Sequence, residues 1–138
     1  MGQFLRMILA GCLLLSVLLA CSQKETQKAP PANVNVELAN KGKELFGKYA
    51  CNTCHSTTGQ AGIGPALNGI YGKQVKLDDG SSVTVDDAYL RESILNPDAK
   101  IVAGYPKGSM SNFIQPYLPE LQKEENLSAL VEYIKSLQ

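Results

Sequence analysis

The short stretch Cys51-Asn52-Thr53-Cys54-His55 constrains what this chain can fold into more than any other feature. It holds two of the four cysteines and the only histidine in 138 residues. If the backbone is helical here, Cys51, Cys54 and His55 occupy positions i, i+3 and i+4 and share one face. Two thiols and an imidazole on one face can attach a haem, bind a metal ion or form a thiol redox centre.

Two of these hypotheses fit the rest of the sequence poorly. A structural zinc site needs four ligands, and the other cysteines, Cys12 and Cys21, lie in or directly after a predicted signal peptide. A thiol–disulfide centre normally lies at the N-terminus of a helix in a βαβ unit. Here the motif follows a predicted helix and no βαβ pattern is visible. The thiol oxidoreductase remains the alternative from the enzyme class.

A covalent haem accounts for the motif best. Two thiols one helical turn apart can bond to the two vinyl groups along one haem edge, and the adjacent imidazole then points at the iron. Met110 is the candidate for the opposite iron ligand, because Met1 and Met7 are removed with the predicted signal peptide. It lies between Gly108 and Asn112 in a predicted loop, off any apolar helix stripe. His/Met ligation is typical of electron-carrying cytochromes and leaves no iron position for a substrate, so we expect an electron carrier and not an enzyme.

The N-terminus carries an export signal followed by a candidate lipid anchor. After Arg6, the run 8–19 is apolar, but as a helix it would span only about 18 Å of a bilayer core of about 30 Å. We therefore predict a cleaved lipoprotein signal peptide over residues 1–20. Leu18-Leu19-Ala20-Cys21 resembles the bacterial lipobox, which implies that Cys21 is lipidated. Residues 21–35 then form a flexible linker, and the protein is expected in the bacterial cell envelope, on the outer side of the cytoplasmic membrane or facing the periplasm.

Residues 36–138 are predicted to form one all-α domain. Apolar stripes predict helices over about 36–49, from an N-cap at Thr84 to Pro97, and over about 124–137. Residues 75–77 and 83–85 flank a turn signal and predict a small β-hairpin. The segments 59–72 and 96–119 are predicted to be irregular, and the five glycines of the first suit a backbone lying close against something flat. Long loops around a thin core are explained by a large apolar cofactor that they enclose.

Charge excludes one class of partner. Basic and acidic side chains number 13 each, so the chain carries no net charge. A nucleic-acid-binding domain would show a basic excess or a basic stripe. We expect no binding to nucleic acid, and we expect a monomer.

Several motifs together resemble a class I mono-haem cytochrome c. They are CNTCHSTTG, GIGPALNGIYG, VTVDDAYLRESILNP, IVAGYPKGSM and LVEYIKSL, spread over about residues 37–137. They are especially similar to the cytochrome c domain of bacterial haem–copper oxidase subunit II. The copper-binding domain of that subunit has no counterpart here, so the resemblance implies a free-standing lipoprotein.

The resemblance implies a set of site residues. Cys51 and Cys54 would carry one haem c through thioether bonds, with His55 and Met110 as iron ligands. The carbonyl of Pro65 would accept a hydrogen bond from the imidazole, and the candidates for contacts to the haem propionates are Arg91 and Tyr105. Gly42 and Phe46 would pack against Leu130 and Tyr133. The family often places proline directly after the ligating methionine, where this chain has Ser111.

The implied function is membrane-anchored electron transfer. The protein would carry single electrons between a quinol-oxidising complex and a terminal oxidase or reductase. The alternative is a haem c subunit held permanently in a respiratory dehydrogenase or reductase complex.

Overall fold

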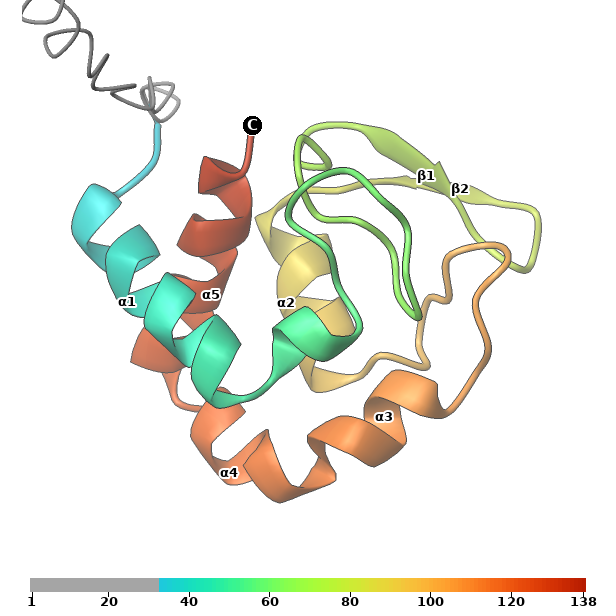
Figure 1. Cartoon of the computed structure of the whole chain (residues 1–138). Coiled ribbons are helices and arrows are strands. Elements are labelled where there is room, and N and C mark those ends of the chain that lie inside the picture. The colour runs from blue at the N-terminus through green and yellow to red at the C-terminus, as the bar shows by residue number, and fades with distance from the viewer. Residues whose placement is uncertain (1–32) are drawn as a thin grey trace, which may run out of the picture.

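The computed structural model describes residues 33–138, which form a mostly helical domain with one small sheet (Figure 1). The predicted signal peptide, Cys21 and the linker up to residue 32 lie outside the described residues. In chain order the elements are α1 (Val36–Lys48), the 3-10 helix η1 (Cys51–Thr53), β1 (Gln74–Lys76), β2 (Ser82–Thr84), α2 (Asp87–Leu95), α3 (Ser109–Ile114), the 3-10 helix η2 (Gln115–Tyr117), α4 (Leu118–Leu121) and α5 (Glu124–Ser136). The predicted all-α architecture with a hairpin is confirmed.

Helices α1 and α5 pack side by side, although they lie at opposite ends of the described chain (Figure 1). Helix α1 starts at Asn35, whose side chain accepts a hydrogen bond of 3.1 Å from the amide of Leu38. The rings of Phe46 and Tyr133 meet edge to face, with centroids 5.3 Å apart. Gly42 lies so close to α5 that a Cβ atom there would be 1.9 Å from the carbonyl oxygen of Ala129. The contact expected between α1 and α5 is therefore present, and it fixes the start of the segment that carries the cysteines.

The N-cap of α2 lies two residues later than predicted. The prediction of Thr84 as N-cap is wrong, because Thr84 pairs with Gln74 in the hairpin. Asp86 is the N-cap instead: its backbone is extended and its carboxylate accepts a hydrogen bond of 2.8 Å from the amide of Tyr89. The helix ends at Leu95, just before Pro97, as expected from the helix-breaking effect of proline.

The hairpin is present with its strands shifted by one residue from the prediction. Its antiparallel register places Val75 opposite Val83. Leu77, predicted as a strand residue, forms an isolated bridge with Val102 instead. This bridge ties the hairpin to the segment that follows α2.

The prediction that the whole segment 96–119 is irregular is wrong in its second half, which contains α3, η2 and the start of α4. This half of the segment contains Pro116 and Pro119. Each lies in the first turn of a short helix, where a missing N–H costs nothing because it has no intrahelical partner. The signal was available in Met110, Ile114, Tyr117 and Leu121, which recur at helical spacing.

A single apolar core joins the helices, with side chains from α1, α2, α4 and α5. Val85 is fully buried and Leu130 is 2% exposed, so solvent does not reach the part of the core where these two side chains lie. In the part of the chain that the structure describes, no helix has the length and apolar character to cross a membrane.

Candidate functional site

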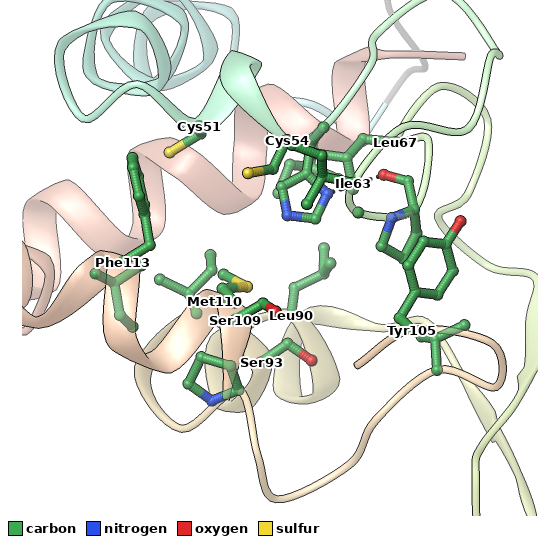
Figure 2. Close-up of a pocket in the computed structure, with 18 of the residues that line it drawn as sticks. Cys51, Cys54, Ile63, Leu67, Leu90, Ser93, Tyr105, Ser109, Met110 and Phe113 are labelled. Atoms are coloured by element: carbon green, nitrogen blue, oxygen red, sulfur yellow. Dashed lines mark hydrogen bonds between the residues drawn. The ribbon is translucent and has the colours of Figure 1, made fainter. Parts of the chain in front are cut away.

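An apolar pocket opens in the middle of the domain (Figure 2). Its empty space is about 1350 Å³ when the open solvent at its mouth is included. Segments far apart in the sequence line it: Phe46 from α1, the stretch around η1, Pro65 from the glycine-rich segment, Leu90 from α2 and Leu130 from α5. Most of the lining is hydrocarbon, as expected for a site that holds a large apolar ligand.

The two cysteines enter the pocket from one tight turn. The backbone reverses at Ala50, which has a left-handed φ of 52°, and then forms η1. The amides of Cys54 and His55 both donate to the carbonyl of Cys51, at 3.2 and 3.0 Å. This turn places the thiols of Cys51 and Cys54 on the same side of the pocket (Figure 2). The two cysteines are not joined to each other in a disulfide, and burial raises the pKa of the Cys51 thiol to about 11.

The imidazole of His55 is held in one orientation. Its Nδ1 lies 2.8 Å from the carbonyl oxygen of Pro65, and an oxygen acceptor at this distance requires that Nδ1 carries the proton. Burial lowers the pKa of His55, so the ring is neutral and Nε2 keeps its lone pair. Gly64 allows this arrangement, because a Cβ atom there would lie 2.6 Å from Cε1 of the ring. The close approach predicted for the glycine-rich segment is present, against the imidazole.

Met110 lies on the opposite side of the pocket from the cysteines (Figure 2). The prediction that it lies in a loop is wrong, because it occupies the first turn of α3. Phe113 and Ile114 of the same short helix also line the pocket. These two residues were not among the predicted site residues, because the helix that carries them was predicted as a loop.

The two candidate propionate contacts differ in position. Tyr105 lines the pocket (Figure 2). Arg91 is not among the lining residues: its guanidinium donates two hydrogen bonds, of 2.9 and 2.8 Å, to Glu124 and one of 2.6 Å to Ser128. The Arg91 side chain therefore faces α5, whereas its neighbour Leu90 lines the pocket.

The donor set of this pocket fits a covalently attached haem. Two thiols lie on one side, beside an imidazole whose Nε2 lone pair is free, and a thioether lies on the other side. These are the side chains that attach haem and ligate its iron in c-type cytochromes. Among residues 33–138, the side chains that line the pocket are mostly hydrocarbon, which suits the apolar faces of a porphyrin.

Comparisons with known proteins agree with this chemistry. A family model described as cytochrome c matches residues 39–138. A cytochrome c2 iso-1 of Magnetospirillum fulvum is 32% identical over 97 residues, which is 63% of this chain and 90% of that protein. The cytochrome c2 iso-1 of Magnetospirillum molischianum is 28% identical over 97 residues, covering 63% of this chain and 89% of that protein. A cytochrome c of Cannabis sativa is 29% identical over 119 residues, or 78% of this chain and 93% of that protein.

The family match begins within α1, extends through α5 and includes the motif at η1. It thereby confirms three expectations: the fold, the covalent haem, and the role as an electron carrier and not an enzyme. The chain belongs to the cytochrome c family of electron carriers and binds one haem c through Cys51 and Cys54.

Proposed function

We propose that the protein is a membrane-anchored, one-electron carrier whose haem iron is ligated by His55 and Met110. One observation carries the ligand assignment: His55 and Met110, from segments far apart in the sequence, both line the apolar pocket that the cysteines enter. When bound, the haem supplies a metal centre that takes up and releases one electron. Ligation by both His55 and Met110 would leave the iron no position for a substrate, and the thioether of Met110 would raise its reduction potential.

The chain's own residues hold the site and keep it free of water. The Pro65 carbonyl fixes the His55 ring and increases the basicity of Nε2, since a hydrogen-bond acceptor at Nδ1 pushes electron density into the ring. Val85, Leu90 and Leu130 are buried and line the pocket floor. Their hydrocarbon excludes water, which limits the solvent reorganisation that accompanies a change of charge. Tyr105, at the pocket wall, is the remaining candidate for a propionate contact.

Substitution of Met110 by leucine tests the ligand assignment. Leucine nearly conserves the side-chain volume, so packing in the pocket should change little, while the sulfur is lost. We expect the sulfur-to-iron charge-transfer band of the oxidised protein to disappear and the reduction potential to fall. Met110→His is the matched control: it restores a second strong ligand without sulfur. A Met110→Leu protein that keeps the band would remove Met110 from the iron.

The anchor is proposed at Cys21, in the lipobox-like sequence that follows residues 1–20. Multiple acyl chains on one cysteine hold a protein on a membrane far more firmly than a single chain does. The protein would then work at the outer face of a bacterial cytoplasmic membrane or in the periplasm. Replacing Cys21 with serine should release a soluble, red protein from washed membranes. Continued sedimentation with the membranes would place the anchor elsewhere.

The proposed partners are a quinol-oxidising complex and a terminal oxidase or reductase. The similarity of the sequence motifs to the cytochrome domain of oxidase subunit II supports this choice, and the linker before α1 would let the domain move between neighbouring complexes. A linker also raises the effective concentration of a tethered domain at its partners. Size-exclusion chromatography of a mild detergent extract tests the free carrier. Co-elution with one stoichiometric complex would instead assign the chain as a permanently bound haem c subunit.

A further inference from the structure

The carboxylate of Asp98 forms hydrogen bonds with one residue before Met110 and one residue after it in the sequence. Asp98 lies just after α2, in the turn that begins with Pro97. Its Oδ1 accepts a hydrogen bond of 2.8 Å from the amide of Gly108, and its Oδ2 accepts one of 2.7 Å from the hydroxyl of Ser111. Both bonds are partly buried. One side chain therefore holds the residues that flank Met110 on either side in the sequence.

Helix α3 has no side-chain cap at its start. It has six residues, and its N-cap is Gly108, which has a left-handed φ of 85° and no side chain to accept a hydrogen bond. A helix of this length is not stable on its own, because nucleation fixes several residues for each hydrogen bond gained. The position of Met110 therefore depends on tertiary contacts, and Asp98 supplies two of them from outside the helix.

The Asp98 carboxylate is ionised when it makes these bonds. The Gly108 amide, followed by the Ser111 hydroxyl, lowers the pKa of Asp98. Hydrogen bonds to an ionised acceptor are shorter and about twice as strong as those between neutral groups. Ser111 contributes through a hydroxyl, so a proline at this position could not form the same contact.

We propose that Asp98 is a positioning residue that anchors Met110 to the end of α2. The inference rests on the proposed role of Met110 as an iron ligand. In this arrangement the Asp98 carboxylate holds the Gly108 amide and the Ser111 hydroxyl, and the backbone between them presents the thioether to the pocket. Loss of the carboxylate would free the first turn of α3, so that Met110 leaves the iron more readily.

Competition with free imidazole measures this directly. Imidazole added to the oxidised holoprotein competes with Met110 for the iron, and loss of the charge-transfer band gives its Kd. We expect the Kd to fall about tenfold in Ser111→Ala and about a hundredfold in Asp98→Ala, since the first loses one charge-assisted hydrogen bond and the second loses two. Asp79→Ala is the matched control. Asp79 accepts a comparable bond of 2.8 Å from the amide of Ser81, but in the hairpin turn, so its Kd should stay within about threefold of the wild type.

Imidazole titration in a Met110→Leu background separates positioning from general loss of stability; there the Kd is read from the shift of the Soret band, because Met110→Leu is expected to lack the charge-transfer band. If Asp98 acts through Met110, then Asp98→Ala has no further effect on the Kd once the thioether is gone. Thermal unfolding of each holoprotein provides the comparison with global stability. The proposal is overturned if Asp98→Ala leaves the Kd of imidazole unchanged, if Asp79→Ala lowers it equally, or if the effect persists without Met110. A separate outcome would overturn the ligand assignment itself: the wild-type protein lacks the charge-transfer band, and Met110→Leu binds imidazole no more tightly than the wild type. The positioning role of Asp98 would then fail as well.

Discussion

Substitution of Gly42 by alanine is a severe test of the contact between α1 and α5. The added Cβ would lie 1.9 Å from the Ala129 carbonyl oxygen, 2.6 Å from the Ala129 carbonyl carbon and 2.7 Å from Cβ of Tyr133. Ordinary van der Waals contact starts at 3.4 Å, so the two helices must separate by about 1.5 Å (3.4 minus 1.9) at this point. The nearest atoms are backbone or Cβ atoms, which cannot move aside without moving the helix.

The expected loss of stability follows from that separation. A gap of about 0.5–1 Å already removes a quarter to a half of the dispersion energy of the facing atoms, and overpacking of a core costs about 1–3 kcal/mol. Alanine also favours the helix over glycine by about 1 kcal/mol, which offsets part of the strain. We expect Gly42→Ala to lower the free energy of unfolding by about 2 kcal/mol or more.

Gly47 provides a control on the same helix. A Cβ atom at Gly47 would meet nothing within 4 Å, so Gly47→Ala should stabilise the protein by about 0.5–1 kcal/mol through helix propensity alone. The assay is urea unfolding of the holoproteins followed by far-ultraviolet circular dichroism, with equal m-values as the check on two-state behaviour. The reasoning is refuted if the two variants differ by less than about 1 kcal/mol, because close packing would then not be what requires glycine at 42.

Two further changes test the site and the pH dependence of stability. Gly64→Ala should push the His55 ring away from the Pro65 carbonyl, because the new Cβ would lie 2.9 Å from Nδ1. A shifted reduction potential and altered paramagnetic NMR signals of the His55 ring would report this change. Unchanged signals would contradict it. Hydrogen bonds from Arg91, then Ser128, lower the pKa of Glu124, so its contribution to stability is complete above its unfolded pKa of about 4.3 and is lost as pH falls through the folded pKa. Glu124→Gln should therefore make the decline of the urea midpoint between about pH 6 and pH 3 shallower, whereas an identical pH profile would show that the pair contributes nothing.

Features that depend on near neighbours in the chain were predictable. The apolar stripes of α1 and α5 give the correct helices because their period reflects the face that each helix buries. The motif at η1 is equally local: the amides that close its turn lie three and four residues after Cys51. Spacing alone therefore indicated that Cys51, Cys54 and His55 act together.

The errors arose where a contact distant in the sequence outweighs a local preference. Thr84 is a good helix cap by type, but pairing with Gln74 across the hairpin holds it in a strand. The orientation of the Arg91 side chain likewise follows from a distant contact, because Glu124 on α5 lies within hydrogen-bond distance of its guanidinium. The predicted hairpin already included Thr84 in its second strand, whereas no pattern around Arg91 reveals its partner.

The two sides of the pocket differ in how much of each could be predicted from the sequence. Cys51, Cys54 and His55 are brought together by one turn of backbone, so their chemistry can be inferred from five consecutive residues. The opposite side is built by α3, a helix too short to form from its own propensity, and by an Asp98 carboxylate ten residues before the amide it holds. A short helix is stable only when the rest of the fold supplies its partners, so the presence of Met110 was visible in the sequence, but its position became known only from the folded chain.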